Sequence, residues 1–319
     1  MRSRHLIILL IAILCSVQKI IAQQDAQFSQ YMYNTLYYNP AFAGVEGVTK
    51  FTLVHRTQWA GFKTSFDGSG GNPTTQVLSA TTPIFKIKGG VGLHIVNDNL
   101  GPQNNIEVQL SYAYHREIKD AKISAGLRIG IFSQTLDFSK YRPVDINDPL
   151  LLLKGRESQI RPDMAIGFYY RARKYYGGIS LNHVLKSEFD FGNSNQRSAL
   201  ESNFTITGGF DYQLNFNITI SPVVLVKTDF NQYSFDVGAI ATYNNKMWGG
   251  ISFRQSEAAI IILGYSLLKD NSLRLGYSFD YIIEEQGAKQ PTSHEILLTY
   301  ALPVTKEPRK IIRTPRFNF

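Results

Sequence analysis

The chain has 319 residues, of which 13% are aromatic, with a mean hydropathy of −0.14 and a net charge of +8. This length allows one large domain or two. Residues 1–22 hold three basic residues, and residues 304–319 hold five basic residues and one acidic residue, which leaves residues 23–303 near +1. A short basic tail is not the basic surface that nucleic-acid binding requires, so the composition argues against a nucleic-acid-binding protein.

Residues 1–22 have the layout of a secretory signal peptide. Two arginines precede an apolar run over residues 6–14, and Ala22 offers the small residue that cleavage requires. The run is shorter than the about 20 residues that a membrane-spanning helix needs. Cys15, the only cysteine, follows a leucine where a lipoprotein signal would have a small residue, so lipidation is not expected. Cleavage after Ala22 would leave a mature chain without disulfides.

Runs of alternating residues are the strongest structural signal. From Leu273 to Tyr281 every odd position is large and apolar, and every even position is polar, charged or glycine. In a strand the two sets face opposite sides of the sheet. Runs of about nine to eleven residues match the length that crosses a bilayer at a tilt. Strands are predicted near 48–57, 74–85, 89–97, 104–118, 122–134, 159–172, 175–185, 201–214, 217–228, 233–243, 247–255, 258–268, 272–283 and 293–303.

The predicted fold is all-β: a transmembrane antiparallel β-barrel of about 14 strands. Tight turns alternate with connections that include long loops, and an even strand number predicts both termini on one side, in the periplasm of a Gram-negative cell. A soluble secreted β-protein would share most of the composition. The predicted parts are a signal peptide (1–22), an N-terminal collar or plug segment (23–47), the outer-membrane barrel (48–303) and a basic C-terminal tail (304–319).

Two residue sets describe the predicted wall. Aromatic residues at strand ends fit the girdles of a membrane barrel, although tyrosine and tryptophan favour strands anyway; they are Trp59, Tyr112, Tyr114, Tyr169, Tyr170, Tyr175, Tyr176, Tyr243, Trp248 and Tyr281. Charges on the inner face indicate a polar lumen in which most of them pair with one another; they are Arg128, Asp211, Lys227, Asp236, Arg254, Arg274, Asp280 and Glu295.

The sequence offers no pattern for catalysis, a cofactor or a metal. Its histidines are scattered singly, without the spacing of metal ligands. Ser293, His294 and Glu295 have the residue types of a catalytic triad. Adjacent residues of a strand point to opposite faces, so these three cannot form one. We therefore expect a protein without catalytic, cofactor-binding or metal sites.

An aromatic and amide-rich stretch precedes the first predicted strand. It runs from Gln27 to Gly44, and Asn39 is held extended by the proline that follows it. This composition is typical of an ordered non-sheet plug or collar whose aromatic residues pack against a partner surface. The alternative is an ordinary N-terminal packing segment.

Several short motifs, in order, resemble the PorP/SprF family of type IX secretion proteins. The resemblance begins near residue 23, where residues 27–32 read QFSQYM and residues 39–44 read NPAFAG, and it continues to the end of the chain. Further motifs are RTQW (56–59), GGISLNH (177–183), WGGISFR (248–254), LGYSFDY (275–281), SHEI (293–296) and the closing PRF (315–317).

The resemblance implies an outer-membrane barrel of the type IX secretion and gliding apparatus, without enzyme activity or cofactor. It implies contacts with periplasmic ring components or with the C-terminal domain of a secreted adhesin, besides outer-membrane lipid. An outer-membrane channel or small-solute transporter of the same architecture is the alternative. The residues predicted to bind a partner are Gln27, Phe28, Ser29, Gln30, Tyr31, Asn39, Pro40, Arg313, Arg316 and Phe317.

Overall fold

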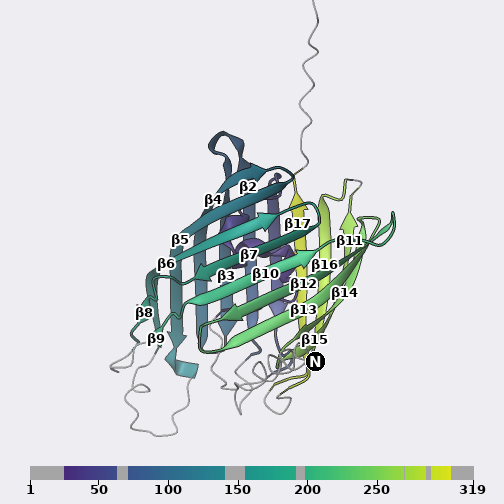
Figure 1. Cartoon of the computed structure of the whole chain (residues 1–319). Helices are drawn as coiled ribbons and strands as arrows, with labels where there is room; N and C mark the ends of the chain where they lie inside the picture. The colour runs from purple at the N-terminus through teal and green to yellow at the C-terminus, as the bar shows by residue number, and fades with distance from the viewer. Residues whose placement is uncertain are drawn as a thin grey trace, which may run out of the picture.

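The computed structural model describes residues 25–62, 71–140, 155–191, 198–268, 270–284 and 289–302, which form a closed antiparallel β-barrel (Figure 1). The predicted signal peptide and the predicted tail lie outside the described residues. The wall has 14 strands, as predicted. They are β1 (Lys50–Thr57), β2 (Thr74–Ile84), β3 (Gly89–Leu100), β4 (Gln103–Ile118), β5 (Ala121–Asp137), β6 (Arg156–Arg171), β7 (Tyr175–Asn182), β10 (Asn203–Phe210), β12 (Ile218–Thr228), β13 (Tyr233–Tyr243), β14 (Met247–Arg254), β15 (Ala258–Leu267), β16 (Leu273–Ile282) and β17 (Thr292–Ala301).

Each wall strand pairs with the wall strands before and after it, and the pairing of the first wall strand with the last closes the ring. The first and last strands, β1 and β17, pair from Lys50↔Ala301 to Thr57↔His294. Strands β10 and β12 pair from Phe204↔Thr228 to Gly209↔Val223. Closure removes the sheet edges that an open sheet of this size would expose, as a bilayer requires. A separate two-stranded ribbon, β8 (Glu188–Phe189) with β9 (Ser198–Ala199), lies between β7 and β10 in the chain.

The alternation of residue types places large apolar side chains on the outer face of the wall and both polar and apolar side chains on the inner face. In β17, Glu295 and Leu297 are buried towards the lumen, and Ile296 and Leu298 are exposed on the outside. Large apolar side chains in the same outward phase are exposed around the barrel, such as Leu110, Ile129, Phe168, Ile251 and Leu263. Such a surface is unfavourable in water and stable against lipid. The wall is therefore that of an outer-membrane barrel, and the soluble alternative is not supported.

The two ends of the barrel differ in their connections, as the sequence predicts. We call one end the short-turn rim; its described residues are 85–88, 119–120, 172–174, 214–217, 244–246, 268 and 270–272. The described residues of the other end, the long-loop rim, are 58–62, 71–73, 101–102, 138–140, 155, 183–191, 198–202, 229–232, 255–257, 283–284 and 289–291.

One predicted strand is interrupted. The sequence predicts a continuous strand over 201–214, but the structure ends β10 at Phe210 and resumes with β11 (Tyr212–Gln213). Pro222, on the facing strand β12, has no N–H to donate to a neighbour. Next to it, Ser221 donates its hydroxyl to the Asp211 carboxylate at 2.7 Å, and the Asp211 N–H turns to the Lys174 carbonyl. The interruption therefore lies where the proline removes a ladder hydrogen bond.

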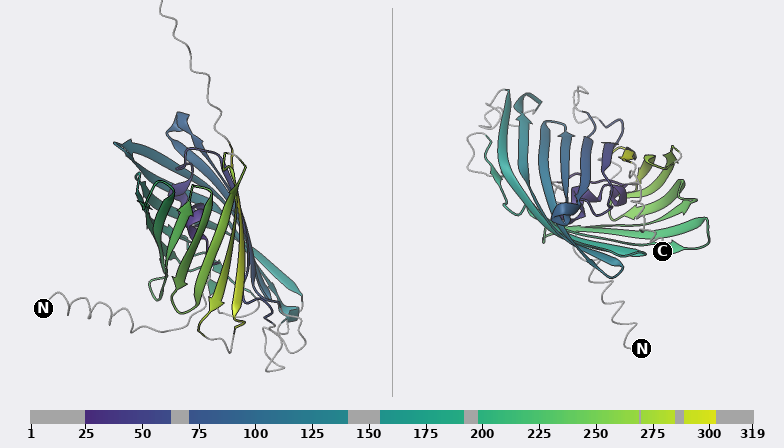
Figure 2. Two further views of the ribbon diagram at one scale, coloured as in Figure 1. Left: turned by 90° about the vertical axis from the view of Figure 1, so that its right-hand side faces the viewer. Right: turned by 90° about the horizontal axis from the view of Figure 1, so that it is seen from above.

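Residues 25–45, which we call the arm, lie inside the barrel (Figure 2). The arm is built of three short turns: η1 (Tyr31–Tyr33), α2 (Thr35–Tyr38) and η2 (Pro40–Phe42). Asn39 stays extended, and its side chain caps η2 by accepting the Ala41 N–H at 2.9 Å. No helix in the described part of the chain is long and apolar enough to span a membrane.

The arm crosses the lumen from one end to the other. Asp25 bonds to His183, which follows the last residue of β7 at the long-loop end. Gly44 bonds to Thr81 and the Val45 carbonyl to Lys122, both at the short-turn end. The described chain begins in the long-loop half and ends at the short-turn rim, because the arm traverses the lumen before β1 starts. That both termini lie in the periplasm stays a prediction.

Candidate functional site

The aromatic residues of the arm form one core with inward apolar residues of the wall, such as Val54 and Ile260. Phe28, Tyr37 and Tyr38 meet edge to face, with ring centroids 5.0–6.5 Å apart. The Tyr38 hydroxyl also accepts the Phe28 N–H at 3.2 Å. Tyr33 packs on the inward Trp248 of β14 at 5.5 Å. Such contacts add to the apolar burial of each ring, so they hold the arm compact against the wall.

A buried ionic cluster lies beside the start of the arm, where the first and last strands meet. Arg56 on β1 binds Asp280 of β16 through Nη2 at 2.8 Å and Glu295 of β17 through Nη1 at 3.3 Å. All three side chains have no solvent exposure. Arg56 and Glu295 are direct register partners across the β1–β17 pair. The cluster therefore forms only when the ring is closed.

The carboxylates of this cluster bind the arm backbone. Glu295 accepts the N–H groups of Ser29 and Gln30 at 2.7 and 2.9 Å. Ser29 donates its hydroxyl to Asp280 at 2.7 Å and accepts from Arg56 at 2.6 Å. These N–H groups are buried, where an N–H without an acceptor would destabilise the fold. Hydrogen bonds to charged acceptors are stronger than those to neutral acceptors.

A second arginine repeats the arrangement on the neighbouring strands. Arg254 on β14 pairs with Asp236 on β13 at 3.0 Å and lies 3.7 Å from Asp280. Its Nη2 donates to the Phe28 carbonyl at 3.1 Å. The wall thus supplies an acceptor for the N–H groups and a donor for the carbonyl of the same stretch of arm.

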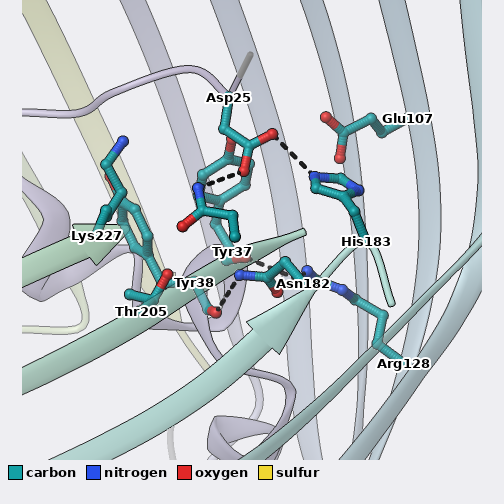
Figure 3. A pocket seen from close by; sticks show the side chains of 10 residues that line it. Asp25, Tyr37, Tyr38, Glu107, Arg128, Asn182, His183, Thr205 and Lys227 are labelled. Carbon is teal, nitrogen blue, oxygen red and sulfur yellow. Dashed lines mark hydrogen bonds and ion pairs between the residues drawn. The ribbon is translucent and has the colours of Figure 1, made fainter. Parts of the chain in front are cut away.

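The start of the arm has its own anchor. His183 lies between two carboxylates. Its Nε2 is 2.9 Å from Asp25 (Figure 3), and its Nδ1 is 3.0 Å from Asp163 of β6. Asn203 at the start of β10 donates to the other Asp25 oxygen at 2.9 Å. Each ring nitrogen thus faces one carboxylate acceptor. The imidazolium form satisfies both acceptors, because it donates a hydrogen bond from each nitrogen.

The charges around this anchor set its protonation state. Burial alone would lower the pKa of His183, but the charges and hydrogen bonds of Asp25 and Asp163 hold that pKa well above its usual range. Burial alone would raise the pKa of Asp25, and His183, with Lys227 nearby, holds it well below its usual range. The pair is therefore ionic at neutral pH.

A small polar cavity separates the arm from the wall at this anchor (Figure 3). Arg128 donates to the Tyr37 carbonyl at 2.7 Å and to Asn182 at 2.5 Å, which ties the wall to the α2 turn. The cavity is lined by Asp25, Tyr37, Tyr38, Glu107, Arg128, Asn182, His183, Asn203, Thr205 and Lys227. Across the described residues no group of three acidic, histidine or cysteine side chains is placed to hold a metal ion.

The second half of the arm lies directly against wall backbone. Asn39 donates its amide to the carbonyls of Phe168 and Ile179 at 2.9 and 3.1 Å. A Cβ at Gly126 would overlap the Pro40 and Ala41 backbone, and a Cβ at Gly167 would overlap the Asn39 side chain. Glycine is needed at both wall positions because the arm approaches this closely.

The structure gathers seven of the residues predicted to bind a partner within the lumen. Gln27, Phe28, Ser29, Gln30, Tyr31, Asn39 and Pro40 are all buried there, where they contact the barrel wall and each other. Arg313, Arg316 and Phe317 lie outside the described residues. That these ten residues bind a partner stays a prediction.

The wall residues that hold the arm were only partly foreseen. Asp236, Arg254, Asp280 and Glu295 face inward and pair, as predicted. Arg56 was missed, although it follows the inward phase of Thr52 and Val54 on its short strand. Ser293 and Glu295 face inward and His294 outward, where it bonds Tyr277 at 2.7 Å, which confirms that the three form no triad.

Replacing Arg56 with glutamine should strongly destabilise the barrel. Asp280 and Glu295 would lose the cation between them while staying buried, which costs about 3 kcal/mol or more. Thermal unfolding in detergent, followed by circular dichroism, measures the loss. Lys50→Gln is the matched control, because it breaks the solvent-accessible Lys50–Glu46 pair and should cost at most about 1 kcal/mol. Equal shifts in the two variants would contradict this role of Arg56.

Replacing His183 with glutamine should destabilise the barrel in a pH-dependent way. The folded-state pKa of His183 is raised, so its stabilisation is complete below about pH 6.5 and is lost as pH rises towards the folded value. The difference in melting temperature between wild type and variant should therefore shrink above neutral pH. A difference that is constant from mildly acidic to alkaline pH would show that His183 acts without its charge.

Solved structures with a similar fold are outer-membrane barrels. A deltaS2S3 mutant of the monoaromatic hydrocarbon channel TodX has a TM-score of 0.50 at 11% identity, and the match covers 84% of this chain and 93% of that chain. The monoaromatic hydrocarbon channel CymD has a TM-score of 0.49 at 12% identity, with 88% and 94% covered. The Ralstonia pickettii toluene transporter TbuX has a TM-score of 0.48 at 13% identity, with 84% and 92% covered. At these identities the likeness extends to the fold alone.

No functionally curated protein sequence matches this chain. A protein family does: its description is type IX secretion system membrane protein PorP/SprF, and the match extends over residues 20–300. The match contains the arm, the wall residues that bind the arm, and all wall strands except Ala301, the last residue of β17. Because it covers nearly the whole chain, this protein belongs to the PorP/SprF family of type IX secretion system membrane proteins.

Proposed function

We propose that this protein is a non-enzymatic anchor of the type IX secretion and gliding machinery in the outer membrane. It supports secretion or surface attachment of adhesin-type cargo and contacts periplasmic ring components. The observation that carries the proposal is the arm itself, which occupies the lumen and is bound by buried charges on β1, β14, β16 and β17. A lumen occupied in this way suits a barrel that holds other proteins better than one that passes solutes.

The proposal places the short-turn rim in the periplasm, as is usual for outer-membrane barrels. Ring components and the C-terminal domain of a secreted adhesin would then meet the rim where the described chain ends at Leu302. The basic residues beyond it would add electrostatic attraction to an acidic partner surface. An outer-membrane channel for small solutes is the competing function, and it requires a continuous path past the arm.

Ion conductance in planar bilayers distinguishes the two functions. The wild-type barrel should show no steady conductance, because the arm blocks the lumen. Gly126→Leu should raise conductance, since a side chain there overlaps the Pro40–Ala41 backbone and displaces the arm. Gly177→Leu is the matched control: its Cβ would lie on the outward face of β7, 3.7 Å from the nearest atom, and conductance should stay low.

Steady conductance of the wild-type protein would contradict the anchor function and favour the channel. Circular dichroism and the heat-dependent shift in gel mobility would report whether each variant is a folded barrel. If Gly126→Leu does not fold, deletion of residues 27–44 from the same gene provides a second way to remove the arm.

Affinity purification from detergent-solubilised envelopes tests the secretion partners. Mass spectrometry of what copurifies should identify ring components or a large adhesin. Deleting residues 306–319, which lie outside the described residues, should leave membrane insertion intact and weaken retention of that partner. The effect should be largest at low salt, because salt already screens the attraction of the tail in the wild type. Arg309, Arg313 and Arg316→Gln together are a milder variant with the same expected direction. Loss of insertion on deletion, or undiminished retention, would contradict the role of the tail.

A further inference from the structure

The two rims carry opposite charge. In the described part of the short-turn rim the connections hold six basic residues and two acidic ones, Asp120 and Asp270. In the described part of the long-loop rim the connections hold three basic residues and six acidic ones. The basic residues of the short-turn rim are Lys86, Lys88, Lys119, Arg173, Lys174 and Lys246, and all are exposed.

These basic residues lie on four hairpin turns of the rim: β2–β3, β4–β5, β6–β7 and β13–β14. The first three turns follow one another in the strand order and carry five of the six residues, and Lys246 on the β13–β14 turn lies on the other side of the β1–β17 seam. The positive charge is therefore densest over the β2–β7 half of the rim.

The same end carries an outward aromatic band. Tyr175, Tyr243, Tyr265 and Tyr300 are each exposed on the outside of the wall near the short-turn ends of their strands. Phe85 and Phe216, at the tips of two turns, are 79% and 100% exposed. Tyrosine at this level of a membrane barrel lies among the lipid headgroups.

One of the basic residues, Lys246, contacts the aromatic band directly. The Lys246 ammonium lies 5.6 Å from the ring centre of Tyr265, on the lipid-facing side of β15. Its charge is thereby held at the upper edge of the apolar wall, where headgroup phosphates lie. Lys86 and Lys88 flank the exposed Ile87 in the same way on the β2–β3 turn.

We propose that the short-turn rim binds the phosphate groups of anionic phospholipids in the leaflet that surrounds it. Lysine and arginine are attracted to an anionic membrane surface, each contributing separately to the attraction. The basic residues lie on the rim of the apolar wall, next to its outward aromatic band, which is where headgroup phosphates are found. The proposal does not depend on which secretion partner the protein has.

Native mass spectrometry of the full mature protein tests the proposal. The protein is held in micelles that contain equal amounts of phosphatidylglycerol and phosphatidylcholine, and the ratio of the two bound lipids is read directly. Wild type should bind phosphatidylglycerol preferentially, less so at high salt. Lys86→Gln, Lys88→Gln and Lys174→Gln together should lower its affinity about fivefold for each lysine removed. This variant leaves the Arg173–Asp120 pair and the Lys246–Tyr265 contact in place.

The matched control removes the same charge from the other rim. Lys140→Gln, Lys186→Gln and Lys289→Gln together lie at the long-loop rim and should keep the preference of the wild type. Equal binding of both lipids by wild type would overturn the proposal, as would an equal loss in the two triple variants. If the short-turn variant keeps its lipid preference but loses an acidic partner protein in envelope purifications, the basic residues of the rim serve a protein and the lipid proposal fails.

Discussion

A chain that enters a barrel lumen must find a partner for each buried backbone N–H and carbonyl group, and this constraint organises the present structure. The arm has no neighbouring strand at residues 28–30 to supply those partners. The wall supplies them from charged side chains: Glu295 accepts the N–H groups of Ser29 and Gln30, and Arg254 donates to the Phe28 carbonyl. Isolated charges would be costly there, so each is balanced by another across neighbouring strands. The buried ionic cluster thus gives the arm backbone the hydrogen-bond partners that a sheet edge gives to an added strand.

The position of that cluster couples the arm to the closure of the ring. Arg56 comes from the first wall strand, Glu295 from the last and Asp280 from the strand before it. Before β1 and β17 pair, Arg56 is separated from both carboxylates, and the binding site for Ser29 does not exist. Once they pair, the arm and the seam stabilise each other, because the same carboxylates serve both. Closure by strands that are far apart in sequence is entropically unfavourable, and the arm contacts help to offset it.

The sequence was sufficient for the wall because the wall obeys one simple period. Outside is lipid and inside is a largely polar lumen, so alternation is strict from Leu273 to Tyr281 in β16, and the predicted limits of β16 and β17 lie within two residues of those observed. The break at Asp211 was not predictable from alternation, because it follows from Pro222 on a different strand. The path of the arm was not predictable either. Its aromatic composition indicates packing, but which wall it packs on depends on glycines such as Gly126 and Gly167, which the alternating pattern does not distinguish from other small residues.

The arm fills the lumen because it folds into short turns and does not run extended. Fully extended, residues 25–45 would reach about 70 Å, which is several times the height of the ~25 Å apolar belt. The short turns η1, α2 and η2 shorten the path and turn Phe28, Tyr37 and Tyr38 onto one another. The rings also pack on inward apolar residues of the wall, among them Val54, Ile260 and Leu297, while the wall charges bind the arm backbone. The barrel is in this sense folded around a segment of its own chain, and the segment that occupies the lumen also completes the interior of the protein.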